Sequence, residues 1–302
     1  MTKRFCRQIG FGKPLLFWGF SLAFGLSRRT SMCSALSSHM LSLLYNQYYF
    51  IFAILPILLF FCGSVMEDDP IIFVFRYESY KHYFTAKWRS LGVLCSGLWL
   101  GQITILFVTG AGLSVIKQGW DNFSGSSLLK DIAPLLVKSF PGAWVAVFCA
   151  AVYMLMGYWL IALLTLWLGH FLQRKKAIKV LLALYILTIL SIKLPIMSRP
   201  PFCYLTGINH WVLLLHNLTA GWRFPLTVIV TLLFVVTVIC SIQGGWRSAA
   251  HHHRISKGLP AYYRHILFSA SNFLVLAISL ALLVGWVWCS GGVPIDGREW
   301  VI

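Results

Sequence analysis

The side chains of this sequence that could do acid–base or metal chemistry are few, and their spacing assembles no site. Only eight of the 302 residues are aspartate or glutamate, and none lies in a long apolar run. His251–His253 are adjacent, so they cannot all face one ion from a helix. His210 and His216 flank a short apolar stretch, but no acid or cysteine joins them at ligand spacing. We therefore predict no metal site and no catalytic residues.

Catalytic and nucleotide-binding motifs are also missing from the sequence. It contains no GxSxG nucleophile elbow, no HExxH zinc motif and no GxxxxGK[ST] phosphate loop. A transporter coupled to protons or sodium usually needs carboxylates at membrane depth, and the apolar runs supply none. We therefore expect that the chain is not an enzyme and holds no cofactor, and that any work it does draws energy from a partner.

The composition indicates a membrane protein. Hydrophobic residues make up 59% of the chain and charged residues 11%, whereas soluble domains are about 25% charged. The apolar residues also form blocks near the roughly 20 residues that cross a bilayer as a helix. We predict an all-α, polytopic membrane protein with six to seven transmembrane helices in a single integral membrane domain, 1–302. The expected spans are 14–27 (the weakest), 41–65, 91–116, 144–169, 180–197, 225–243 and 266–288.

Lysine and arginine are concentrated in alternate loops, which orients the predicted spans. With the N-terminus in the cytoplasm, four of them fall in each of four inside segments and nine fall outside. The C-terminus is then outside, provided that 14–27 spans. The net charge of +17 favours contact with anionic lipid over nucleic acid, because no folded domain presents the basic residues as a patch. We expect a multi-pass protein of the cell membrane.

The loop Asp69–Ser90 has the pattern of an amphipathic helix on the cytoplasmic surface. Its aromatic residues recur at steps of three and four, which places them on one face. One reading is a lipid-interface anchor; the other is a docking helix for a cytosolic subunit, whose anchors would use the same spacing. The predicted docking residues are Phe73, Arg76, Tyr77, Tyr80, Lys81, Phe84 and Trp88.

The loop Ser198–Arg223 falls outside in this topology and contains an apolar core. Trp211 and Leu214, flanked by His210 and His216, predict a short segment that dips into the outer leaflet; the alternative is a structured loop. Cys203 and Cys289 also fall outside, and spacing alone leaves open whether they form a disulfide.

Within the spans, small and polar residues predict helix packing. Gly97 and Gly101 form a GxxxG pattern, which lets helices approach closely. Gln102 is a strongly polar residue at depth, and Asn46 and His170 lie near span ends. We attach packing and no chemistry to the glycine pattern.

The order of these elements resembles the permease subunits of type-2 ABC exporters, including the small peptide and lantibiotic exporters of Gram-positive bacteria. The segment Arg76–Ser90 (RYESYKHYFTAKWRS) looks like their cytoplasmic Arg-Tyr-x-Ser…Trp helix. The resemblance covers most of 41–243, although a seventh predicted span follows where the family stops at six. It implies that Asp69–Ser90 contacts a separate ATPase, which holds the ATP and Mg²⁺. It also implies that two permease copies or homologues line the path, in a bacterial plasma membrane.

Two other functions fit the same pattern. The chain could be an accessory or immunity membrane subunit that binds a partner without transport, or a polytopic enzyme acting on lipid. For a transporter, the sequence leaves open whether the cargo is a peptide, a lipid or a drug.

Overall fold

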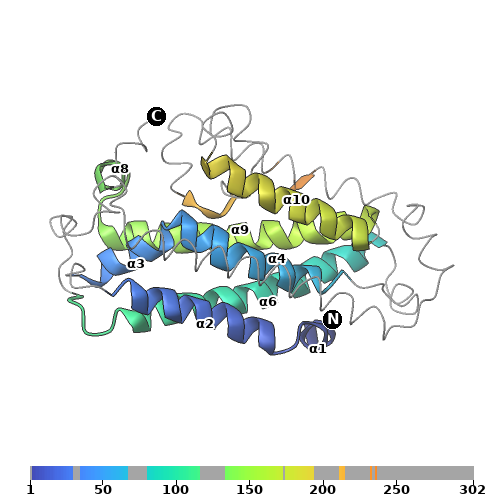
Figure 1. Ribbon diagram of the computed structural model, residues 1–302, viewed down its shortest axis with the longest axis horizontal. Coiled ribbons are helices and arrows are strands. Elements are labelled where there is room, and N and C mark those ends of the chain that lie inside the picture. The colour runs from blue at the N-terminus through green and yellow to red at the C-terminus, as the bar shows by residue number, and fades with distance from the viewer. Residues whose placement is uncertain are drawn as a thin grey trace.

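The computed structural model describes residues 2–29, 35–66, 80–115, 133–172, 174–193 and 211–214, together with 232, 235 and 236. The predicted span 266–288 lies outside the described residues, as does nearly all of 225–243. The described elements are α1 (Thr2–Ile9), α2 (Gly12–Ser27), α3 (Leu36–Leu44), the π-helical turn η1 (Tyr49–Ile54), α4 (Leu55–Gly63), α6 (Tyr80–Thr109), α8 (Ala133–Ser139), α9 (Ala143–Phe171) and α10 (Arg174–Lys193). The longer helices run side by side along the molecule (Figure 1).

Two helices of this bundle are long and apolar enough to cross a membrane, His82–Thr109 and Ala143–His170. Leu36–Leu44 and Tyr49–Gly63, which meet at 59°, add a third if the bent pair is one span. Large apolar side chains on the outer faces of α6 and α9 suit contact with lipid; they are Val93, Leu100, Phe107 and Val108 on α6, and Val145, Phe148 and Met156 on α9. The chain is therefore helical and consistent with a membrane protein, and the expected 144–169 span corresponds to α9.

The other predicted spans differ in form. The 14–27 stretch is the 16-residue α2, which is shorter than the roughly 20 residues that cross a bilayer. The described part of 180–197 belongs to α10, which begins earlier, at Arg174. Its first turns carry Arg174, Lys175, Lys176 and Lys179, so α10 does not meet the same criterion of length and apolar composition.

The predicted span 41–65 is broken into two segments. The break falls between α3 and η1, where the Asn46 side-chain oxygen accepts a hydrogen bond from the Tyr49 backbone N–H at 2.9 Å. This bond satisfies a backbone donor at the new helix start, as an N-terminal cap does. Pro56 lies in the first turn of α4, a position that tolerates a residue without an N–H.

The segment Tyr80–Ser90, predicted as part of a separate surface helix, is continuous with the following span in α6. This helix has 30 residues, about 45 Å at 1.5 Å per residue. Gly92 lies just beyond the aromatic segment, but a single glycine lowers helix propensity by only about 1 kcal/mol, and the helix continues through it. It ends at Thr109 rather than at 116, where Gly110 and then Gly112, with φ of 89°, turn the chain. There the Arg29 side chain donates to the Ala111 carbonyl at 2.6 Å.

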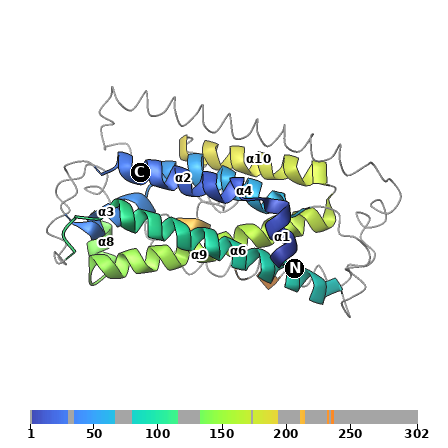
Figure 2. The ribbon, with the colours of Figure 1, turned by 90° about the horizontal axis from the view of Figure 1, so that it is seen from below.

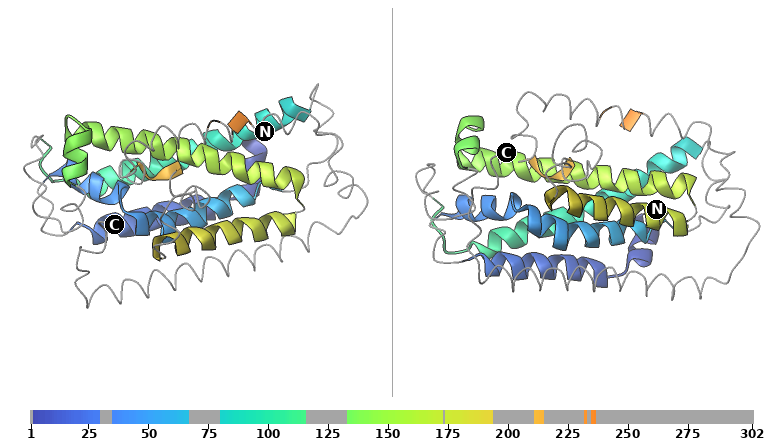
Figure 3. Two further views of the ribbon diagram at one scale, coloured as in Figure 1. Left: turned by 90° about the horizontal axis from the view of Figure 1, so that it is seen from above. Right: turned by 45° about the horizontal axis from the view of Figure 1, so that its top comes forward.

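α9 runs antiparallel to α6, whereas α2 runs parallel to α6, and the helix termini gather at two ends. At one end Phe84 of α6 lies against His170 of α9, with ring centroids 6.3 Å apart. At the other, Gly25 of α2 lies against Thr109 of α6. Figure 2 shows α1 crossing the first of these ends, and Figure 3 shows α10 running alongside α4 and α9.

A buried hydrogen-bond network joins four elements at the middle of the bundle. Gln102 of α6 donates to the Tyr49 hydroxyl at 3.1 Å and accepts from the Tyr158 hydroxyl of α9 at 2.7 Å. Tyr49 in turn donates to Ser21 of α2 at 2.7 Å, and Ser21 donates to the Phe17 carbonyl. We call Ser21, Tyr49, Gln102 and Tyr158 the Gln102 network; all four residues are buried.

Tryptophan side chains form a second set of bonds between helices. The indole N–H groups of Trp18, Trp88 and Trp99 donate to the carbonyls of Leu98, Trp159 and Ala151, and Trp159 donates to the Ser96 hydroxyl. Glycines make room for two of these rings. A methyl group on Gly92 would lie 2.8 Å from the Trp159 ring, and one on Gly101 would lie 2.6 Å from Trp18 Cε2. These contacts fix α6 against α2 and α9.

Replacing Gln102 by leucine should lower the free energy of unfolding by about 1–2 kcal/mol, because the substitution removes two buried hydrogen bonds and leaves the Tyr158 hydroxyl without its acceptor. Thr104→Val is the matched control, since Thr104 is exposed and bonds only to Leu100 in its own helix. Denaturant titration in detergent micelles measures both. Equal effects from the two variants would show that the Gln102 network does not stabilise the bundle.

The two glycines of the GxxxG pattern should respond differently to alanine. Gly101→Ala pushes against the Trp18 ring and should lower the thermal midpoint, whereas a methyl group on Gly97 meets nothing within 4 Å. Gly97→Ala should therefore be neutral or stabilise by up to about 1 kcal/mol through helix propensity. Thermal unfolding of both variants in the same detergent is the test, and a larger loss for Gly97→Ala contradicts the packing.

Candidate functional site: the basic end of the bundle

The predicted docking residues divide into three groups in the structure. Phe73, Arg76 and Tyr77 lie outside the described residues. Tyr80 and Lys81 are in the first turn of α6. Phe84 and Trp88 pack within the bundle: Phe84 is 5% exposed, and Trp88 donates its indole N–H to the Trp159 carbonyl at 3.1 Å.

Phe84 and Trp88 are therefore used inside the protein, on the face of α6 that meets α9. The aromatic periodicity that suggested a docking face also fits a helix buried along one side, because both need anchors three and four residues apart. A partner that meets α6 would contact its other face, where Arg89 is exposed.

Lysine and arginine residues are concentrated in the helix termini at this end of the bundle. They come from α1, the starts of α2 and α6, and the start of α10: Lys3, Arg4, Arg7, Lys13, Lys81, Lys87, Arg89, Arg174, Lys175, Lys176 and Lys179. We call this the basic end. Gly169 and Met66 also meet there, since a methyl group on Gly169 would lie 3.2 Å from Met66 Cγ.

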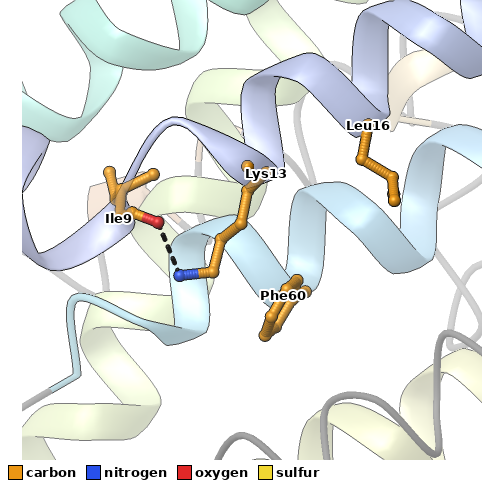
Figure 4. A pocket seen from close by; sticks show the side chains of 5 residues that line it. Ile9, Lys13, Leu16 and Phe60 are labelled. Atoms are coloured by element: carbon orange, nitrogen blue, oxygen red, sulfur yellow. Dashed lines mark hydrogen bonds between the residues drawn. The ribbon is translucent and has the colours of Figure 1, made fainter.

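A small open cavity lies at the basic end, in the elbow between α1 and α2. Ile9, Gly12, Lys13, Leu16 and Phe60 line it, and its volume is about 250 Å³. The Lys13 ammonium donates to the Ile9 carbonyl at 2.7 Å and lies 4.8 Å from the centre of the Phe60 ring (Figure 4). Sequence reasoning missed this elbow cavity, although Gly10 and Gly12 between a basic and an apolar segment signal a turn.

The predicted outer segment packs against the centre of α9. Val212, Leu213 and Leu214 are buried, and Trp211 is partly buried. Gly157 of α9 makes the contact, because a methyl group there would lie 2.6 Å from Val212 Cγ2 and 2.8 Å from its Cα. His210 and His216 lie outside the described residues.

No group of three or more potential metal ligands occurs among the described residues. Cys62 and Cys95, buried on α4 and α6, have their sulfur atoms 3.9 Å apart and are free thiols. Cys203 and Cys289 lie outside the described residues. The described side chains thus offer hydrogen-bonding, cationic and apolar surfaces.

Comparison with known proteins gives no relative. No protein-family model matches the chain, and neither a curated protein nor a solved structure matches it significantly. Its function is therefore inferred from its own residues.

Phe84→Ala should destabilise the protein by about 3 kcal/mol, since it empties a buried aromatic position against His170. Arg89→Ala, on the exposed face of the same helix, should change stability by less than about 0.5 kcal/mol. Denaturant unfolding of both variants distinguishes packing from surface residues. A small effect of Phe84→Ala would mean that this side chain is free for a partner.

Proposed function

We propose that this chain is the transmembrane subunit of an ATP-driven ABC transporter of the exporter type, powered by a separate ATPase subunit. The observation that carries the proposal is the course of α6. Its first eleven residues, Tyr80–Ser90, are most of the segment Arg76–Ser90 that resembles the family's cytoplasmic helix, and they continue without a break in a helix able to span a membrane. A partner bound to this segment would act directly on a membrane helix.

The interior contacts of α6 support transmission of such a movement. Gln102 lies 22 residues from Tyr80, about 33 Å along the helix axis. There α6 is bonded to Tyr49 and Tyr158, so a displacement of α6 reaches η1 and α9 through direct hydrogen bonds. The Trp99 bond to Ala151 lies one turn away and joins the same two long helices.

The remaining parts of the proposal follow from charge. In a bacterial plasma membrane the basic end faces the cytoplasm by the positive-inside rule, which is where an ATPase would bind. The apolar segments carry no carboxylate for ion coupling, so the energy comes from ATP and Mg²⁺ in the partner. A second copy or homologue would complete the path for a peptide, lipid or hydrophobic drug.

One observation favours a second candidate. The Gln102 network joins its four residues to one another in the middle of the bundle, where a transporter would instead present polar groups to its cargo. An accessory or immunity subunit that binds a partner without transport fits such a closed interior. Cargo movement in vesicles containing the chain and its ATPase separates the two functions.

The docking test must avoid Phe84, because its replacement would disturb packing as well as binding. We expect Tyr77→Asp combined with Lys81→Glu to reduce co-purifying ATP hydrolysis at least about tenfold, the loss of about 1.4 kcal/mol of binding. The measurement is ATPase activity of the complex isolated from native membranes through a tag on this chain.

Lys138→Glu is the matched control, since Lys138 lies on α8, next to the start of α9 at the other end of the bundle. It makes the same charge change as Lys81→Glu alone and should leave ATPase recovery unaltered. Undiminished recovery with the double variant, in a protein that elutes as the folded chain, would rule out docking on Asp69–Ser90.

A further inference from the structure

The elbow cavity combines an apolar lining with a cation at its edge. Leu16 and Phe60 supply apolar surface from α2 and α4, and Lys13 supplies the ammonium. At about 250 Å³ it is smaller than the roughly 300–1,000 Å³ of sites that enclose a whole small molecule. It therefore suits part of a larger ligand, such as an amphiphile whose remaining length lies outside the cavity.

The helix that forms one wall of the elbow adds positive charge and no negative charge. α1 carries Lys3, Arg4 and Arg7 and contains no acidic residue. Its apolar residues Phe5 and Ile9, four positions apart, are both buried. α1 is thus a short basic helix whose buried apolar residues fix it across the end of the bundle.

Exposed apolar side chains surround the elbow. Phe11 is 87% exposed and Leu15 is 64% exposed, and both flank the lining residues Gly12, Lys13 and Leu16 in sequence. Gly10, with φ of 70°, permits the turn that brings α1 across the end of α2. Apolar residues so placed beside cations suit a lipid boundary, where acyl chains and headgroups meet.

We propose that the elbow cavity binds an anionic phospholipid. Part of one acyl chain packs against Leu16 and Phe60, and the phosphate lies beside the Lys13 ammonium, within the positive field of α1. The Lys13 ammonium over the Phe60 ring holds the charge at the boundary between the apolar lining and the headgroup region. The bound lipid would contact α1, α2 and α4 together, because residues of all three helices line the cavity.

The test uses the full-length protein in detergent micelles, titrated with phosphatidylglycerol or with phosphatidylcholine of the same acyl chains. Native mass spectrometry counts the bound lipids and gives a dissociation constant for each. We expect the wild-type protein to bind phosphatidylglycerol more tightly, and Lys13→Gln to weaken that binding about fivefold. This is the loss of about 1 kcal/mol for one cation near an anionic group.

Three further variants define the site. Lys13→Arg keeps the charge and should retain the tighter binding of phosphatidylglycerol. Lys138→Gln removes a cation from α8 and should leave the affinity for both lipids unchanged. Gly12→Leu fills the cavity, where a methyl group meets nothing within 4 Å, and should weaken binding of both lipids.

Two results would overturn the proposal. One is equal affinity of the wild-type protein for the two lipids; the other is a Lys13→Gln variant that still binds phosphatidylglycerol as much more tightly than phosphatidylcholine as the wild-type protein does. Displacement of the lipid by millimolar inorganic phosphate would refute the part played by the acyl chain. The wild-type comparison holds even if a variant does not fold. No ATPase is present in the measurement, so its outcome is independent of the proposed transporter function.

Discussion

The bundle depends on neutral hydrogen bonds between helices, because its described segments contain no aspartate or glutamate with which their cations could pair. In an apolar environment a buried polar group without a partner is costly, and two sets of bonds between helices satisfy such groups. The Gln102 network does this with one amide and three hydroxyl groups from four elements. The tryptophan indoles do it by donating to carbonyls or to a serine hydroxyl on the neighbouring helix.

This constraint gives α6 its central place. It accepts a hydrogen bond from α2 at a backbone carbonyl, and its Gln102 side chain bonds to η1 and α9. Two of its glycines make room for tryptophan rings, one from α2 and one from α9. The same helix begins at the basic end, where the cationic termini of α1, α2 and α10 also lie. A ligand, lipid or subunit bound at that end therefore acts on the helix that the other helices pack against, and this links the proposed function to the lipid site at the elbow.

The sequence predicts the apolar parts of the two membrane-length helices, α6 and α9, better than the boundaries between elements. The 144–169 prediction agrees with α9 because its apolar residues are uninterrupted. The prediction of a surface helix ending at Ser90 was wrong for Tyr80–Ser90, since neither the change from polar to apolar composition nor Gly92, two residues further on, ends α6. The break at Asn46 was missed because Asn46, only two residues after Leu44, was taken for a polar residue near a span end and not for a helix cap.

The contacts inside the bundle could not be predicted from one sequence. Gln102 stands out as a polar residue at depth, but its partners come from segments more than fifty residues away in either direction. The GxxxG spacing suggests two packing glycines, yet only Gly101 faces a neighbouring side chain, because the path of α2 decides which positions are covered. Phe84 and Trp88 were assigned to a partner by their spacing, and the position of α9 brings them into the interior instead.

The continuity of α6 underlies both its packing and its proposed role, and a distance between two spin labels measures it. Labels at His82 and Val108, both exposed, would be attached to the full-length chain in lipid after its native cysteines are replaced by alanine. A continuous helix of 26 residue steps predicts a narrow distribution near about 39 Å. A helix that turns at residue 90 to lie on the membrane surface would give about 30 Å, and that result would contradict the account.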